Sequence, residues 1–222
     1  MKLTELPEWP RETKRAREVQ VVLQKRIVIR PLMKVPGLIA GVDAAFFEDK
    51  IIGVACLYRY PDLTPLKDSV SIRKVTFPYI PGLLSFREGP VVIEALEGLE
   101  TAPDLILFDG QGIAHPRGVG IASHIGVLLG IPSIGCAKSR LVGDFREPGG
   151  KKGSRSPLRY KERVVGAVVR SRDNVRPLFV SPGHLVDIEG SVEYVLACTS
   201  RYRLPEPTRR ADRLSKERSL RV

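Results

Sequence analysis

The spacing of hydrophobic positions changes several times along the chain, and each spacing predicts a different element. Near the start, Val19, Val22, Leu23 and Ile27 recur at helical spacing and predict a first helix with one buried face. Three apolar runs follow at residues 38–46, 49–61 and 69–77, separated by short polar or proline-containing turns. Runs of this length and composition predict three strands, joined as an antiparallel meander.

The middle of the chain alternates between helical spacing and buried runs. Gly89 and Pro90 predict the start of a second helix, because proline suits the first helical turn. The apolar stripe of this helix consists of Val92, Ala95, Leu96 and Leu99. Residues 103–110 and 131–138 are typical of buried strands, and the helix between them carries Ile121, Ile125 and Leu128. This strand, helix, strand order predicts parallel pairing.

The last third of the chain adds further elements without a repeat or a long linker. Strands are expected at residues 162–171 and 176–183, a helix at residues 184–202, and a basic helix or tail from about residue 207. Residues 147–163 are basic and rich in glycine and serine, which predicts a mobile surface loop. The pattern predicts an α/β protein, in which helices flank a mixed sheet of an antiparallel meander plus parallel strands. We expect one domain over residues 1–222.

Composition narrows the class of protein. The chain has 222 residues, 43% of them hydrophobic, which suffices for one substantial core. No apolar run approaches the ~18 residues of a membrane span, and the first residues lack the apolar stretch of a signal peptide, so we expect a cytoplasmic protein without a membrane partner. Three widely spaced cysteines predict reduced core thiols. A net charge of +11 favours a polyanionic partner, with nucleic acid as the leading candidate.

Acidic residues interrupt the apolar runs in two places. Asp43 and Asp109 each end a run, and burial of a lone carboxylate is costly unless it is paired or bound to a cation. Glu88 immediately precedes the expected helix start at Gly89, where the helix dipole would favour its ionised form. Each residue alone is explained by a turn, a cap or a solvated charge. Together, three oxygen ligands without a histidine or cysteine cluster favour a site for Mg²⁺ or Mn²⁺.

A second unusual segment holds a tyrosine between prolines. Pro78 and Pro81 stiffen the backbone around Tyr79 and predict an extended loop that cannot be a central strand. Taken alone, this segment is better explained by a turn whose tyrosine, isoleucine and leucine side chains pack on the core. His115 lies on a glycine-rich stretch after Asp109 and is expected to be functional, with a turn histidine as the alternative.

Other charged residues are candidates for phosphate contacts. Lys138 ends an expected strand at the same sheet edge as Asp109 and is expected to face a phosphate group of a bound nucleic acid, with a solvated lysine as the alternative. Five arginines are candidates for phosphate-backbone contacts, or are surface charges: Arg117, Arg140, Arg209, Arg210 and Arg213. His124, along a helix, and His184, at an expected helix start, are expected to be structural.

From about Val19 to Arg213 the chain resembles the endonuclease V family, nucleases that act on inosine in nucleic acid. The resemblance rests on an ordered set of motifs: GVDAAF, TFPYIPGLLSFREGP, FDGQGIAHPRGVGIASH, IGCAKSRL, VSPGH and LPEPTR. It implies a ribonuclease H-like fold and acidic residues that bind Mg²⁺, with Mn²⁺ as a substitute. It also implies hydrolysis of the second phosphodiester bond on the 3′ side of inosine, leaving 3′-hydroxyl and 5′-phosphate ends.

The resemblance also implies roles for individual residues. Asp43, Glu88 and Asp109 would hold the metal, and the loop of Pro78, Tyr79, Ile80 and Pro81 would act as a wedge where the nucleotide leaves the stack. The pocket for the flipped base would be formed by Gly82, Leu83, Leu84, Gly110, His115 and Ile121. Its backbone groups would distinguish hypoxanthine from adenine, because the donor and acceptor pattern of the base edge is reversed.

One position departs from the family pattern. Asp212 stands where many relatives carry a histidine near the metal site, and Pro207 suits the first turn of a helix that would carry Asp212 toward the carboxylates. Asp212 is therefore a fourth catalytic candidate, with a surface ion pair to Arg209 or Lys216 as the alternative. The expected partner is DNA containing deoxyinosine, or inosine-containing RNA, bound by a monomer. Two other functions stay open: a junction-cleaving ribonuclease H-like nuclease, and a nucleic-acid-binding protein without cleavage.

Overall fold

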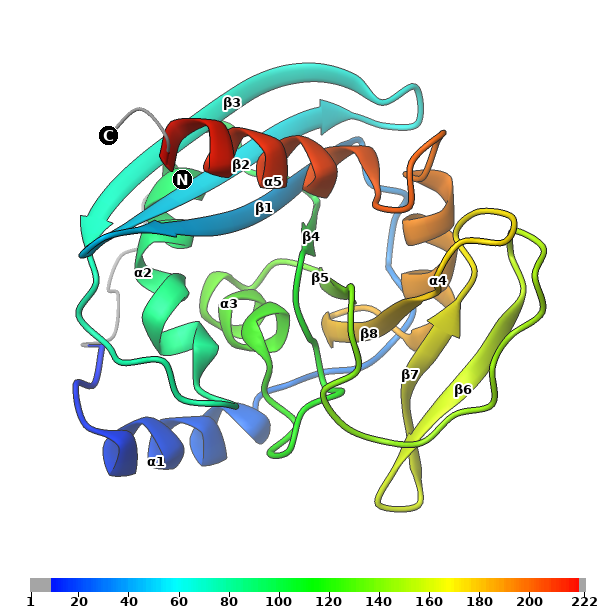
Figure 1. Ribbon diagram of the computed structural model, residues 1–222, viewed down its shortest axis with the longest axis horizontal. Helices are drawn as coiled ribbons and strands as arrows, with labels where there is room; N and C mark the ends of the chain where they lie inside the picture. Colours follow the sequence, from blue (N-terminus) through cyan, green and yellow to red (C-terminus); the bar gives the residue numbers. More distant parts are fainter. Residues whose placement is uncertain (1–8, 220–222) are drawn as a thin grey trace.

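The computed structural model describes residues 9–219, with both ends of this range at the surface (Figure 1). Its helices are α1 (Thr13–Gln24), α2 (Leu84–Glu97), α3 (Ile121–Leu129), α4 (Ile188–Ala197) and α5 (Glu206–Ser219). Its strands are β1 (Leu38–Phe47), β2 (Lys50–Arg59), β3 (Thr64–Lys74), β4 (Leu105–Phe108), β5 (Ser133–Ala137), β6 (Arg155–Tyr160), β7 (Arg163–Val169) and β8 (Leu178–His184).

All eight strands form one mixed sheet in the order β3-β2-β1-β4-β5-β8-β7-β6. The β1, β2 and β3 strands form the predicted antiparallel meander. The β4–α3–β5 unit is the predicted crossover, and its strands pair in parallel. β1 also pairs in parallel with β4, which joins the two halves of the sheet. The predicted α/β class with a mixed sheet is therefore confirmed.

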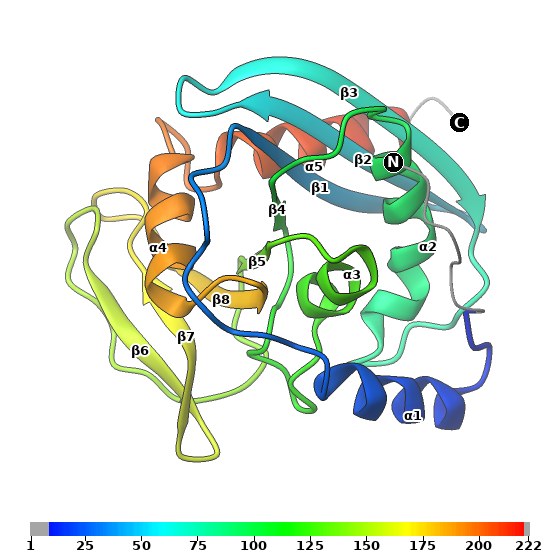
Figure 2. The same ribbon diagram turned by 180° about the vertical axis from the view of Figure 1, so that it is seen from behind.

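Helices cover both faces of the sheet, because alternate residues of the central strands point to opposite sides. Ala40, Val42, Ile106 and Phe108 pack in a core with α2 and α3. Ile39, Leu105 and Leu107 pack on the other face in a core with α4. Figures 1 and 2 show α5 crossing β1 and β2 on the face opposite to α2.

A glycine allows α5 to approach β1 closely. A Cβ atom added to Gly41 would lie 2.1 Å from the carbonyl carbon of Pro207, the second residue of α5. Only glycine permits this contact, so the first turn of α5 rests directly on the backbone of β1. As a result, a helix from the end of the chain lies over the first strand.

Two helix predictions need correction. In α1 the buried residues are Ala16, Gln20 and Leu23, whereas the Val22 side chain is 60% exposed, so the buried face is rotated relative to the predicted one. α2 begins at Leu84 rather than at Gly89, and Pro90 lies inside it. The helix starts directly after the turn at Gly82, which has a positive φ of 77°. The predicted apolar stripe of α2 is nevertheless buried.

Two predictions in the last third also need correction. Within residues 147–163, which were expected to form a loop, Arg155–Tyr160 form the edge strand β6 and pair with β7. Charged and small polar residues are common on edge strands, where they prevent further pairing, so composition alone does not separate such a strand from a loop. His184 ends β8 rather than starting a helix, since α4 begins at Ile188 with Asp187 as its N-cap.

Cys56, Cys136 and Cys198 are buried free thiols, as predicted. Over residues 9–219, none of the helices has the length and apolar character needed to cross a membrane.

Candidate active site

Two aspartates meet where the parallel pairing of β1 and β4 ends. The last paired residues are Val42 and Phe108, and the next residues in each strand direction are Asp43 and Asp109. The Asp109 amide donates a hydrogen bond to the Val42 carbonyl, at 3.4 Å. Asp43 does not end its strand as expected, because β1 continues to Phe47 while paired with β2. The two carboxylates nevertheless lie together where the β1–β4 pairing ends, as a shared metal site requires.

Helix α5 adds a third aspartate to this group. Among the described residues, carboxylate oxygens of Asp43, Asp109 and Asp212 lie within 4.8 Å of one another. Ser215, one turn after Asp212 in α5, donates from its hydroxyl to Asp43 Oδ2 at 2.8 Å. This bond fixes α5 to the site a second time, beyond the close contact at Gly41. Asp212 was expected here from sequence, but Ser215 was not.

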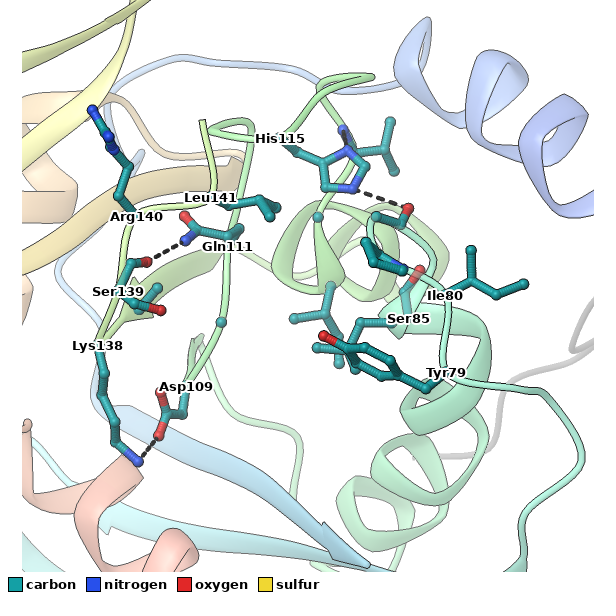
Figure 3. Close-up of a pocket in the computed structure, with 18 residues that line it drawn as sticks. Tyr79, Ile80, Ser85, Asp109, Gln111, His115, Lys138, Ser139, Arg140 and Leu141 are labelled. Carbon is teal, nitrogen blue, oxygen red and sulfur yellow. Dashed lines mark hydrogen bonds and ion pairs between the residues drawn. The ribbon is translucent and has the colours of Figure 1, made fainter. Parts of the chain in front are cut away.

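Lysines neutralise part of this charge. Lys138 Nζ lies 2.5 Å from Asp109 Oδ2 and 2.6 Å from Asp212 Oδ1, and Figure 3 shows its side chain reaching Asp109. Lys216 Nζ lies 2.8 Å from both carboxylate oxygens of Asp212. The ion pair with Lys216 that the alternative explanation predicted is therefore present, but Asp212 also belongs to the acidic group and is not only a surface partner of this lysine.

The electrostatics of the aspartates differ with their surroundings. Burial, followed by the nearby Asp109 carboxylate, raises the pKa of Asp43 to about 7. Burial also raises the pKa of Asp109, although the hydrogen bond from Lys138 opposes it. At Asp212 burial acts in the same direction, but hydrogen bonds from Lys138 and Lys216 outweigh it and the pKa is lowered. Crowded carboxylates of this kind, all with oxygen donors, fit a divalent cation such as Mg²⁺.

Glu88 lies near this group without belonging to it. It is in the interior of α2, not before a helix start, so the expected stabilisation by the helix dipole is wrong. Burial, followed by the charges of Asp43 and Asp109, raises the pKa of Glu88 to about 8. The negative charges of the two aspartates therefore act on the Glu88 carboxyl group, but Glu88 lies outside the closely spaced set of three aspartates.

A pocket opens beside the carboxylates (Figure 3). Its lining includes most of the predicted base-pocket and wedge residues: Tyr79, Ile80, Pro81, Gly82, Leu84, Gly110, His115 and Ile121. Asp109 and Lys138 line the same pocket, so it is continuous with the acidic group. Pro78 and Leu83 are not part of the lining, and Leu83 is buried in a core with Phe77 and Phe86. The Tyr79 side chain is 68% exposed at the rim, as expected for a residue on a rigid arm.

The extended segment of residues 78–82, called the arm below, is held to the rest of the protein by hydrogen bonds to one carbonyl group. The Gly82 carbonyl accepts hydrogen bonds from Gln20 Nε2 at 3.0 Å, from His115 Nε2 at 3.0 Å and from Arg117 Nη2 at 2.7 Å. Gln20, which is buried in α1, also donates to the Val119 carbonyl at 3.2 Å. Three donors on a single carbonyl hold the backbone of the arm in one orientation, which fixes the wall of the pocket.

His115 takes part in this anchor as a neutral ring. Burial, followed by the charge of Arg117, lowers the pKa of His115 to about 4. Its Nδ1 atom accepts from the Arg117 amide at 3.2 Å, which leaves Nε2 to donate to Gly82. The histidine predicted to be functional is thus a pocket residue with a defined hydrogen-bonding role.

Several pocket residues were not predicted from sequence. One feature of the sequence marks Gln20 as unusual: it is a polar residue among the apolar residues of the buried face of α1. Ser85 lines the pocket and hydrogen-bonds His124 Nδ1 at 2.8 Å, and Gln111 donates to the Ser139 carbonyl at 3.0 Å. His124 is buried against Trp9 and Phe86, as expected for a structural residue.

The candidate phosphate-binding arginines already have partners within the protein. On α5, Arg209 pairs with Glu206, Arg210 with Asp68 and Arg213 with Glu217. Arg140 pairs with Asp144, and Arg117 is engaged at Gly82. Their predicted contacts with nucleic acid stay predictions.

Comparison with known proteins decides the family. The model of the endonuclease V family matches residues 21–213. The chain belongs to the endonuclease V family. Endonuclease V from Geotalea uraniireducens is 50% identical over 93% of this chain and 88% of its own. Endonuclease V from Methanothrix thermoacetophila is 48% identical over 99% and 97% of the two chains.

Solved endonuclease V structures share the fold. That of Streptomyces avermitilis is 40% identical, with a TM-score of 0.91 over 99% of this chain and 98% of its own. Endonuclease V from Ciona intestinalis, at 24% identity and a TM-score of 0.84, was solved in complex with DNA containing an inosine, covering 94% and 97% of the two chains. The predicted resemblance is confirmed, and so is the enzyme class, a nuclease.

Proposed function

We propose that this endonuclease V recognises inosine in nucleic acid and hydrolyses the second phosphodiester bond on its 3′ side, leaving 3′-hydroxyl and 5′-phosphate ends. One observation carries the proposal: Asp109 belongs to the acidic group and also lines the pocket. A base held in the pocket would thereby bring its own strand across the carboxylates. The inosine-containing DNA in the Ciona intestinalis structure supports the choice of base.

The proposed cofactor is Mg²⁺, with Mn²⁺ as a substitute. Asp43, Asp109 and Asp212 would hold it, with Glu88 nearby, which revises the predicted set by adding Asp212. A bound divalent ion activates water at neutral pH and stabilises charge on the leaving oxygen. No covalent enzyme intermediate is required, since the group contains carboxylates rather than a nucleophile aligned with a base.

Side chains of the protein would position the strand. The Lys138 ammonium group, which bridges Asp109 and Asp212, would contribute positive charge at the scissile phosphate. Ser215 would hold Asp43 in place through the hydrogen bond to its Oδ2 atom. Tyr79, exposed at the pocket rim, would replace the stacking that the inosine nucleotide loses, and Pro78 and Pro81 would stiffen the backbone around it.

The base itself would be read by backbone groups. Gly82, Leu84, Gly110 and Ile121 line the pocket, and the hydrogen bonds to the Gly82 carbonyl hold this wall rigid. A fixed set of donors and acceptors favours hypoxanthine over adenine, because the two bases present opposite patterns at positions 1 and 6. All these groups come from one chain, so a monomer suffices, and we place the enzyme in the cytoplasm with its substrate.

The proposal is tested with matched duplexes, one of which contains a single deoxyinosine, incubated with Mg²⁺ or with EDTA. The expected result is metal-dependent cleavage of the inosine strand alone, with the cut mapped to the second bond on the 3′ side. Matched RNA substrates show which nucleic acid is preferred. Cleavage of an inosine-free four-way junction, or inosine binding without cleavage in Mg²⁺, would contradict the proposal.

A further inference from the structure

A second groove lies on the far side of His115 from the base pocket. Its walls are α1 and the hairpin of β6 and β7, and residues 113 and 115–118 form its base. His115 lines both the pocket and this groove, so the two depressions adjoin at one side chain. The charged, aromatic and aliphatic side chains that line the groove include Val21, Arg117, Tyr160, Lys161, Arg163 and Val164.

The charge of the groove is one-sided. Arg117, Lys161 and Arg163 line it, and its lining contains no aspartate or glutamate. Within residues 9–219, none of these three cations forms an ion pair with a carboxylate. Another basic depression, beside β6, differs because Asp144 lines it. The uncompensated charge of the groove is complementary to a phosphate backbone.

The hairpin holds its cations in a defined place. Tyr160 and Arg163 form the last pair of the β6–β7 ladder, and Lys161 and Glu162 form a two-residue tip with φ values of 48° and 62°. Such a tip is the tight hairpin turn whose twist matches the strands, so Lys161 and Arg163 project from a rigid element. Lys161 Nζ lies 5.2 Å from the centre of the Tyr160 ring.

The groove also offers apolar surface beside the cations. Val21 on α1 and Val164 on β7 are 51% and 38% exposed, on opposite walls, and Tyr160 lies between charged neighbours. Cations that follow a backbone, together with apolar and aromatic surface for bases, are the combination that single-stranded nucleic acid requires.

We propose that this groove binds the substrate strand on the 5′ side of the inosine. The inference rests on the proposed function, because it takes the cut to lie at the acidic group. Figure 3 shows Asp109 and Lys138 at one end of the base pocket and His115, which also lines the groove, at the other. Since the proposed cut is on the 3′ side of the inosine, the strand that leaves the pocket away from the carboxylates is the 5′ side.

The test compares two single-stranded DNA substrates with the same deoxyinosine and the same 3′ flank. One has a long 5′ flank, and the other has two nucleotides before the inosine. The double variant Lys161→Gln/Arg163→Gln removes two charges from the groove. The control Lys34→Gln/Lys74→Gln removes two charges from exposed lysines outside it. KM and kcat are measured for each pair, together with the dependence of affinity on salt.

With the long 5′ flank, the groove variant is expected to raise KM about tenfold relative to the control variant and to lower the salt slope by about 1.4, or 0.7 for each lost phosphate contact. With the short flank, this difference between the two variants should shrink to less than about twofold. Equal losses on both substrates, or a loss that follows the length of the 3′ flank, would overturn the proposed path. A native enzyme that cuts neither inosine substrate would instead contradict the proposed function.

Discussion

At the scale of single residues, the pKa of an aspartate in this site depends on its immediate neighbours. Burial and Asp109 together raise the pKa of Asp43, whereas two lysines lower that of Asp212 only a few ångströms away. Asp43 and Asp109 were predictable, because an acid that interrupts an apolar run needs a partner. Ser215 was not, since its contact with Asp43 joins positions 172 residues apart and no local pattern marks it.

The first prediction concerns these two aspartates. Asp43→Ala and Asp109→Ala each remove one carboxylate from the acidic group but leave most of the pocket lining and the basic surface in place. We expect cleavage in Mg²⁺ to fall to less than about one hundredth of the native rate, while binding to inosine DNA stays measurable in a gel-shift assay. Near-native turnover by either variant would contradict the site assignment.

The second prediction concerns Asp212, the departure from the family pattern. A negatively charged oxygen ligand can hold Mg²⁺ directly, whereas a neutral imidazole acts more readily on water. Asp212→Ala is therefore expected to lose most activity in Mg²⁺ and to regain part of it when Mn²⁺ is raised, and Asp212→His should retain more activity than alanine. As a control, Glu217→Ala changes an exposed acid on the same helix. An Asp212→Ala enzyme with the native rate in low Mg²⁺ would show that Asp212 serves only its lysine partners.

At the scale of elements, turns and close contacts determine where α2 begins and which face of α1 is buried, which the hydrophobic periodicity alone did not predict. The Gly89-Pro90 pair indicated a helix start, yet the turn at Gly82 begins α2 two residues later and Pro90 falls inside it. Proline tolerates both positions when neighbouring packing is strong enough, and sequence spacing does not report that packing. Sequence spacing also does not report the packing of α1, where Gln20 is buried because it donates hydrogen bonds to the Gly82 and Val119 carbonyls.

The third prediction concerns the arm between β3 and α2. Tyr79→Ala removes an exposed ring at the pocket rim without disturbing a buried contact, so the fold and melting temperature should be retained. Loss of base stacking worth ~1–3 kcal/mol should lower kcat/KM on duplex about tenfold or more, and less on single strands, because only a duplex stack must be opened. Equal losses on both substrates would remove the wedge role.

The fourth prediction concerns Gln20 as a positioning residue. Gln20→Met keeps the volume but removes one of the three donors to the Gly82 carbonyl and the donor to the Val119 carbonyl. It also removes the acceptor of Arg117 Nε, so a cost of about 1–3 kcal/mol is expected for the groups left without this partner. We expect the preference for inosine over adenine, measured as a ratio of kcat/KM values, to fall about tenfold because the pocket wall loosens. Val22→Met, on the exposed side of the same helix, is the control. Destabilisation with an unchanged ratio would indicate a purely structural role.

At the scale of the whole molecule, the fold brings distant parts of the chain to one site. The close contact at Gly41 and the Ser215 bond hold α5, at the end of the chain, over β1, near its start. Local patterns predicted the meander and the crossover, but the docking of α5 followed only from the resemblance, because it depends on contacts between the two ends of the chain. The molecule also contains three histidines, and the pKa of each is lowered, chiefly by burial.

The fifth prediction uses His124, whose pKa burial lowers to about 3. Below pH 6.5 the unfolded chain binds a proton at this ring while the folded protein does not, so the free energy of unfolding decreases as pH falls. No charged group contributes to the shift, and the ring packs between Trp9, Phe86 and the Ser85 hydroxyl. His124→Asn keeps a polar group near Ser85 without a titrating ring. Between pH 6.5 and pH 5, urea unfolding should show the native protein losing about 1.6 kcal/mol more than the variant. Parallel curves for the two proteins would mean that His124 is protonated in the folded state.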